Sequence, residues 1–145
     1  MNRVAQLEQS YRRIAAMRMA GLPVCNEALQ VQCLGFRGWE GKILGALVAP
    51  WCVNLVIFPD GDPRYRELGD DKRQAWEFAC GTIDFQGGRD VGCGSFQTCS
   101  LFSPAFEFTC QDAAVATALA ALRALFEPEP AAPSRRGFLT GRRAA

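Results

Sequence analysis

Apolar residues near the amino terminus recur at intervals of three and four, the spacing that places them along one side of a helix. They are Val4, Leu7, Tyr11 and Ile14. Asn2 precedes this run and is predicted to cap the helix, and the residues that would end it are Gly21, Leu22 and Pro23. The chain is therefore expected to begin with an amphipathic helix whose arginines face solvent.

The pattern then changes to short apolar runs separated by glycine and proline, which is typical of strands. We predict strands at residues 29–36, 42–48, 52–58, 75–80, 82–85 and 95–102. The run at 52–58 is apolar at nearly every position, which indicates a central strand covered on both faces. Gly81 is predicted to form a tight hairpin turn, and residues 87–90 a second turn.

A second helical pattern follows in an alanine-rich stretch, with apolar residues at intervals of four, three and four: Val115, Leu119, Leu122 and Phe126. Asp112 is predicted to cap this helix. Three prolines prevent it from continuing and favour an extended segment beyond it: Pro128, Pro130 and Pro133.

These elements predict an α+β fold, in which a mainly antiparallel sheet of five to six strands carries the N-terminal and C-terminal helices on one face. We expect residues 1–127 to form a single domain and residues 128–145 to be a flexible, disordered tail rich in proline and arginine. The 145 residues are 49% apolar and include ten phenylalanines, enough for one hydrophobic core.

The formal net charge of +1 hides an asymmetry along the chain. Four of the 16 basic residues follow Pro133, which leaves 12 against 15 acidic residues in the remainder, a balance of about −3. Such a body argues against nucleic-acid binding and favours a cationic partner. No apolar run is long enough to span a membrane or to serve as a secretion signal, so we expect a cytoplasmic protein.

Cysteine and histidine usage bounds the chemistry. The seven cysteines contain no C-x-x-C pair, so they indicate reduced structural thiols rather than a zinc or thioredoxin-like site. If a pair is redox-active, Cys93 and Cys99 are the candidates. The chain has no histidine, which excludes catalytic arrangements that need one. We therefore predict no enzymatic activity, no catalytic residue, no metal and no cofactor.

Glycine, tryptophan and arginine gather between residues 35 and 55, and Trp and Arg are enriched at binding hot spots. The predicted partner-binding residues are Arg37, Trp39, Glu40, Trp51 and Asn54. The alternative is that the tryptophans fill the core and the glycines serve strand bends. The two interpretations are balanced for Trp51 and Asn54, whereas binding is favoured for Arg37 and Trp39.

Near the carboxyl end stands Ser134-Arg135-Arg136-Gly137-Phe138-Leu139-Thr140, which reads like the core of a twin-arginine export signal. A working signal needs an apolar stretch of roughly 7 to 15 residues after its charged region, and only five residues follow here. The motif therefore indicates mimicry of a signal that the protein handles, as in a chaperone of an exported redox enzyme.

Several collinear segments resemble the HybE/HupJ group of nickel-iron hydrogenase assembly chaperones: residues 35–41, 44–59, 99–108 and 134–139. The resemblance implies an accessory protein that binds the small-subunit precursor and its twin-arginine signal peptide before export. It leaves open the large subunit and other maturation factors as partners, and a redox or iron-handling role in iron-sulfur cluster maturation as the alternative function. Some relatives carry an attached rubredoxin domain, whose paired cysteine motifs this chain lacks.

Signal binding would require an apolar groove with an acidic rim, for which the candidate arginine partners are Glu40, Asp84 and Glu107. The tail residues Arg135, Arg136, Phe138 and Leu139 are predicted to occupy this groove when the client is absent. Two alternatives remain open: the tail is read by another protein such as the export receptor, or it is a basic end without a signal-related role.

Overall fold

The computed structural model describes residues 3–19, 21–23, 25–69, 71–90 and 93–128. Two helices flank six strands in chain order: α1 (Arg3–Ile14), followed by a π-helical turn η1 (Ala15–Met19), then β1 (Gln32–Trp39), β2 (Lys42–Ala49), β3 (Cys52–Pro59), β4 (Arg73–Phe78), β5 (Gly81–Asp90), β6 (Gly94–Phe102) and α2 (Gln111–Leu125). The predicted α+β fold with a six-stranded antiparallel sheet is confirmed. Asn2 and residues 129–145 lie outside the described residues, and so do the predictions made for them.

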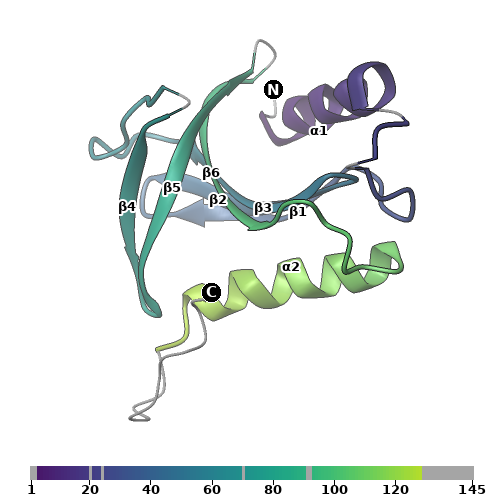
Figure 1. Cartoon of the computed structure of the whole chain (residues 1–145). Helices are drawn as coiled ribbons and strands as arrows, with labels where there is room; N and C mark the ends of the chain where they lie inside the picture. The colour runs from purple at the N-terminus through teal and green to yellow at the C-terminus, as the bar shows by residue number, and fades with distance from the viewer. Residues whose placement is uncertain (1–2, 20, 24, 70, 91–92, 129–145) are drawn as a thin grey trace.

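The strands form one sheet in the order β1-β2-β3-β6-β5-β4, and every neighbouring pair is antiparallel. The largely apolar strand β3 lies in the middle, as predicted, and the loop after it carries the chain to the far edge, where β4 begins (Figure 1).

The predicted turn at residues 87–90 is wrong, because these residues continue β5 to Asp90. Gly87 is needed there for close approach rather than for a turn. A Cβ at this position would lie 2.5 Å from the carbonyl oxygen of Leu68, so only glycine lets the loop before β4 lie against the strand.

The two helices cover opposite faces of the sheet, so the prediction that both lie on one face is wrong (Figure 1). The reason lies in β3, whose side chains supply two apolar sets. Leu55 and Ile57 belong to the core on the α2 side, while Val56 and Phe58 belong to the core on the α1 side. Each apolar face needs its own cover.

On its face, α1 reaches across to the distant strands. Leu7 is fully buried in a cluster that includes Phe96 of β6, and the Ser10 hydroxyl donates to the Asp90 carboxylate at the end of β5 (2.6 Å). The backbone N–H of Cys33 in β1 donates to the Glu8 carboxylate (2.7 Å). This helix is therefore tied to both halves of the sheet.

The second helix begins one residue earlier than its predicted cap. Cys110 is the residue at the cap position, and its side chain makes no capping bond, so Asp112 lies in the first turn. There its negative carboxylate stabilises the helix by interacting with the positive end of the helix dipole. At the other end, the N–H of Cys80 in the β4–β5 turn donates to the Leu125 carbonyl (3.1 Å), which holds the hairpin tip against the helix. Among the described residues, no helix is long and apolar enough to cross a membrane.

Candidate functional site

An apolar hollow, which we call the α2 groove, opens between α2 and the sheet. It has a volume of about 380 Å³. Its walls come from strands β3, β5 and β6, from the β4–β5 turn, and from the carboxyl end of α2 with the residues after it: Leu55, Cys80, Ile83, Cys99, Leu101, Ala121, Ala124, Leu125, Glu127 and Pro128. The volume is in the range of roughly 300–1,000 Å³ that ligand pockets occupy.

The groove exists because α2 lies over β1, β2 and β3 and leaves β5 and β6 without a helix on this face. Gly35 in a bulge of β1 helps to seat the helix there. A Cβ on Gly35 would approach Leu122 to 2.7 Å, so glycine allows close packing at this edge of the sheet. On the groove side, Ala121 and Ala124 offer only methyl groups, which do not fill the space.

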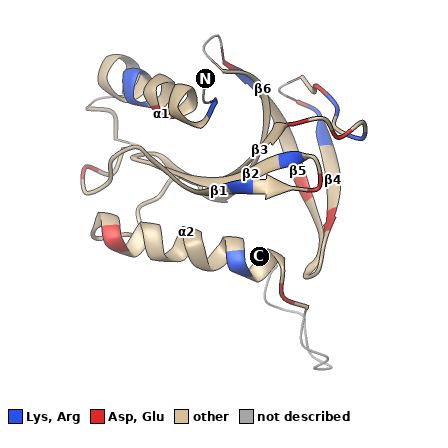
Figure 2. Cartoon of the chain, turned by 180° about the vertical axis from the view of Figure 1, so that it is seen from behind, with Lys and Arg blue, Asp and Glu red and all other residues tan. Residues whose placement is uncertain are grey.

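Few charges border the groove. Glu127 is the charged residue among its lining residues, and α2 itself carries charged side chains only near its two ends (Figure 2). Burial raises the pKa of the Cys99 thiol to about 11, and the negative charge of nearby Asp84 adds to this effect. Cys99 is therefore a neutral thiol at neutral pH.

A cluster of aromatic rings forms the boundary beside the groove. Trp39 stacks on Phe78 with ring centroids 4.4 Å apart and meets Phe126 edge to face at 6.4 Å. The guanidinium of Arg37 lies 4.5 Å from the centroid of the Phe126 ring. Since Phe126 sits between Leu125 and Glu127, Arg37 and Trp39 come close to the end of the groove.

A second hollow of about 380 Å³, the polar pocket, lies on the other side of Trp39. Its lining consists of charged, amide and aromatic side chains with two smaller residues: Trp39, Glu40, Pro63, Arg64, Arg66, Gln74, Ala75, Trp76 and Glu77. Glu40 and Gly41 both have positive φ and form the two-residue turn between β1 and β2, which places this turn at the pocket.

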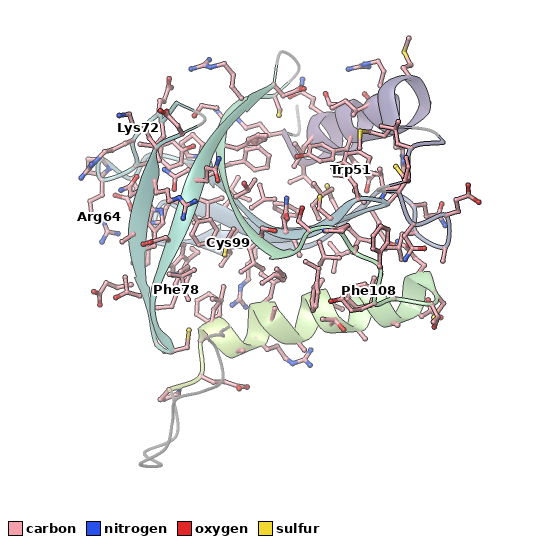
Figure 3. All side chains as sticks on the ribbon, in the orientation of Figure 1. Trp51, Arg64, Lys72, Phe78, Cys99 and Phe108 are labelled. Atoms are coloured by element: carbon pink, nitrogen blue, oxygen red, sulfur yellow. The ribbon has the colours of Figure 1, made fainter. Side chains whose placement is uncertain are left out.

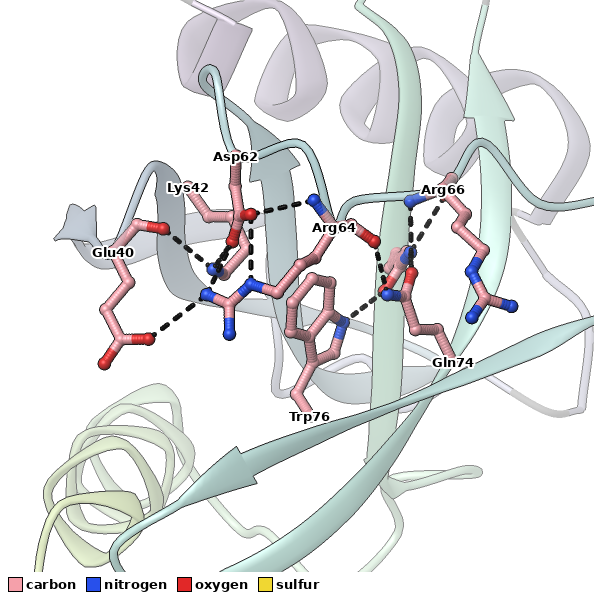
Figure 4. Close-up of polar contacts among 8 residues, drawn as sticks. Glu40, Lys42, Asp62, Arg64, Arg66, Gln74 and Trp76 are labelled. Atoms are coloured by element: carbon pink, nitrogen blue, oxygen red, sulfur yellow. Dashed lines mark hydrogen bonds and ion pairs between the residues drawn. The ribbon is translucent and has the colours of Figure 1, made fainter.

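Lys42 lies beneath the polar pocket and is completely buried. Its ammonium donates to the Glu40 carbonyl oxygen (2.9 Å) and pairs with the Asp62 carboxylate (Figure 4). The same ammonium lies 4.3 Å from the ring centroid of Trp39 and 4.5 Å from that of Trp76. Both faces of Trp39 are thus used within the protein, one by Phe78 and one by Lys42.

Asp62 binds a second cation, because Arg64 donates to its carboxylate at 2.8 Å. The hydrogen bonds from Arg64, and then those from Lys42, hold the pKa of Asp62 well below its usual range. Arg64 also reaches Glu40 (3.4 Å), but both of these side chains are 61% exposed, so this pair is weak.

Amide side chains complete the polar network (Figure 4). The indole N–H of Trp76 donates to Gln97 (2.7 Å), and Gln97 donates to the Gln74 side chain (2.9 Å) and to the Arg66 carbonyl (3.0 Å). Gln74 in turn donates to the Arg64 carbonyl (2.7 Å). These bonds fasten the loop after β3 to strands β4 and β6, so the polar pocket is a structural device.

The five predicted partner-binding residues do not form one site. Arg37 and Trp39 contact Phe126 at the end of α2, and Glu40 lines the polar pocket. Trp51 instead lies on the α1 side, where it stacks on Tyr11 at 5.6 Å (Figure 3). Asn54 alternates with the β3 residues that face α2, so it also faces the α1 side, and it is only 9% exposed. Its side-chain oxygen has no hydrogen-bond partner among the described residues.

The three predicted acidic partners are also separated. Glu40 belongs to the polar pocket, and Asp84 adjoins the groove residue Ile83 on β5. Glu107 is exposed in the loop before α2, a helix length or about 22 Å from the groove end at 1.5 Å per residue. Asp84 is exposed and alternates along β5 with Ile83 and Phe85, which face α2, so its side chain points to the opposite face of the sheet. Glu127, which was not predicted, is therefore the acid that lines the groove.

Cys93 and Cys99 do not form a pair. Cys93 is buried in the core on the α1 side, and Cys99 faces the α2 groove on the opposite face (Figure 3). Burial raises the pKa of three further thiols, to about 12 for Cys33 and Cys52 and about 11 for Cys93. The described part of the chain contains no group of three or more His, Cys, Asp or Glu residues placed to hold a metal ion.

Comparison with known proteins gives one family over nearly the whole chain. The family model for NiFe-hydrogenase assembly chaperone HybE matches residues 2–144. The solution structure of HybE from Escherichia coli has the same fold, with a TM-score of 0.70 at 24% identity over 99% of this chain and 92% of that one.

Two curated relatives agree with the family model. Protein HoxT of Cupriavidus necator is 39% identical over 164 residues, covering 99% of this chain and 90% of the relative. Hydrogenase expression/formation protein HupJ of Bradyrhizobium diazoefficiens is 40% identical over 147 residues, covering 93% and 85%. The chain therefore belongs to the HybE family of NiFe-hydrogenase assembly chaperones.

Proposed function

We propose that this chaperone binds the precursor of a nickel-iron hydrogenase small subunit before export, and that the α2 groove holds the apolar part of its twin-arginine signal. The observation that carries the proposal is the open apolar groove beside α2, on a chain of the hydrogenase assembly family. The role is one of binding, with no chemical step.

The groove suits an apolar peptide segment. Leu101, Ile83 and Cys99 are partly exposed on the part of the sheet face that α2 leaves uncovered, and Ala121 and Ala124 leave room beside them. Each apolar client side chain that becomes buried contributes about 1.5–3 kcal/mol, from which the cost of ordering the peptide is subtracted. Two or three such side chains supply about 3–9 kcal/mol before that subtraction, so a dissociation constant of order micromolar, which needs about 8.2 kcal/mol, requires more than three buried side chains.

Charge would orient the client rather than supply most of its affinity. The signal arginines meet a body with a net charge of about −3, and Glu127 stands at the end of the groove. Exposed pairs of this kind contribute less than about 1 kcal/mol each. Affinity should therefore depend more on the apolar residues of the signal than on its arginines.

Calorimetric titration of the full chain with a synthetic small-subunit signal peptide tests the proposal. We expect binding that weakens strongly when the apolar stretch carries serines, and weakens only modestly when both arginines become lysines. Absence of binding to the unmodified peptide, together with binding to the folded small subunit, would contradict the role of the groove in signal recognition.

One observation favours a redox or iron-handling alternative: the thiols of Cys80 and Cys99 line the same groove. Protein purified without oxygen should then contain iron and show visible absorption bands that are lost in Cys99→Ser. Colourless protein without iron would leave the signal-binding role as the supported function.

A further inference from the structure

The α2 groove lies at the point where the described part of the chain ends. Glu127 and Pro128 are lining residues of the groove, and Pro128 is the last described residue. The 17 residues that follow therefore start from its edge. Any segment among them that can bind the groove has a high local concentration there.

The length of the chain permits such an occupant. Six residues separate Pro128 from Arg135, and at about 3.1 Å per residue they span roughly 19 Å. The whole of α2, with 15 residues, is about 22 Å long. Phe138 and Leu139 can therefore lie against Leu101 and Ile83 after the chain turns back.

The chemistry of the tail fits the groove and its border. Phe138 and Leu139 supply apolar side chains for uncovered sheet residues, and Arg135 and Arg136 supply cations next to Glu127. The tail carries four arginines after Pro133, opposite in sign to the body with its net charge of about −3. Charge complementarity and apolar contact thus select the same segment.

We infer that residues 134–140 occupy the α2 groove of their own chain when no client is bound, and that a twin-arginine signal must displace them. This inference rests on the proposed function, because it assigns a regulator to the same site. It makes the chaperone selective, since a weakly binding apolar peptide does not displace the tail.

The loss of apparent peptide affinity that the tail causes can be estimated from its effective concentration at the groove. A segment tethered by a few residues has an effective concentration of order 1 mM. If its affinity in free solution is about 100 µM, it occupies the groove about 90% of the time and weakens binding of a competing peptide about tenfold.

The experiment compares three full-length proteins: the unmodified chain, Phe138→Ser/Leu139→Ser, and the matched control Ala131→Ser/Ala132→Ser, which changes two apolar residues of the tail outside the motif. The first readout is the rate at which iodoacetamide alkylates Cys99, measured by peptide mass spectrometry. Cys33, half-buried near α1, is the internal reference. We expect Cys99 to react about tenfold faster in the Phe138→Ser/Leu139→Ser protein only.

Equal Cys99 rates in all three proteins would overturn the inference. Protection that grows with protein concentration would overturn it in this form, because the tail would then come from a second copy. The second readout, binding of a synthetic small-subunit signal peptide, separates the two claims. If all three proteins bind the peptide tightly and have equal Cys99 alkylation rates, the proposed function stands and the tail does not occupy the groove. If Cys99 is alkylated faster in the Phe138→Ser/Leu139→Ser protein but no protein binds the peptide, the tail occupies the groove and the proposed function is wrong.

Discussion

The α2 groove and the polar pocket have the same volume, about 380 Å³, and are separated by the ring of Trp39 and its aromatic neighbours, yet they differ in what remains uncovered. Beneath the polar pocket, the side chains of Lys42, Asp62 and Gln97 find their partners within the chain. In the groove, Leu101 and Ile83 keep apolar surface that nothing in the described part of the chain covers.

This difference indicates that the polar pocket has a structural role and that the α2 groove is the binding site. Charged and aromatic residues first suggest function, but Arg64, Trp39 and Trp76 of the polar pocket are engaged with one another or with the buried Lys42–Asp62 pair. The amide bonds beside them hold a loop to the sheet. Uncovered apolar surface next to a helix instead marks an interaction site, because a bound partner would remove that surface from water. Substitutions in the two regions should therefore give opposite results, with stability lost in one and binding lost in the other.

The largest expected effect is on stability. Lys42→Met keeps the length of the side chain but removes the buried charge, its pair with Asp62 and its contacts with Trp39 and Trp76. We expect the free energy of unfolding to fall by about 2–4 kcal/mol, measured by urea denaturation. Binding of the signal peptide by the folded protein should stay within about twofold. A variant as stable as the unmodified protein would show that the network is not structural.

The same network predicts acid sensitivity. Arg64, and after it Lys42, lower the pKa of Asp62 in the folded state below the value of about 3.9 found in unfolded chains. The stabilisation is therefore present above about pH 4 and is lost as the pH falls through the folded-state pKa. Asp62→Asn should be less stable at pH 7 and should show a flatter decline of unfolding free energy between pH 5 and pH 2. Parallel pH profiles would contradict this assignment.

A matched isoleucine pair tests the groove. Ile83 is partly exposed in the groove, and Ile43 is partly exposed on the opposite face near α1. Ile83→Ser and Ile43→Ser should lower the unfolding free energy by similar amounts of about 1–2 kcal/mol. Only Ile83→Ser should raise the dissociation constant of the signal peptide, by about tenfold or 1.4 kcal/mol in calorimetry. Equal effects on binding would remove the groove as the site.

The smallest effect concerns the border of the groove. Glu127→Gln removes the charge nearest its end, and we expect a two- to fourfold weaker complex at low salt. The difference should disappear near 0.5 M salt, because exposed charge pairs are screened there. Asp112→Gln, at the other end of α2, is the control and should leave peptide binding unchanged. A loss that persists at high salt would mean that Glu127 makes a specific hydrogen bond.

The sequence contained most of the fold. Apolar spacing located both helices and all six strands, and the nearly continuous apolar run of β3 identified the central strand. That same run implied cover on both faces, so it already conflicted with placing both helices on one side. The extension of β5 through Gly87 was missed, because the glycine serves a close contact with Leu68 that depends on tertiary structure.

The candidate site was harder to predict from the sequence than the fold was. Residue type directed attention to Trp39 and Glu40, which belong to or border a structural network, and to Trp51 and Asn54 on the other face. The groove residues are ordinary strand and helix positions. Their exposure follows from where α2 rests on the sheet, and local sequence patterns do not encode that position. The sequence predicted that the alanines of α2 favour a helix, but it did not predict that Ala121 and Ala124 line a groove.

The most direct test of the difference between the two hollows is an NMR titration of the isotopically labelled full chain with the small-subunit signal peptide. The account predicts that amide resonances of Ile83, Cys99 and Leu101 shift, while those of Lys42, Asp62 and Gln97 stay in place. Shifts concentrated at the polar pocket, with the groove resonances unchanged, would contradict it.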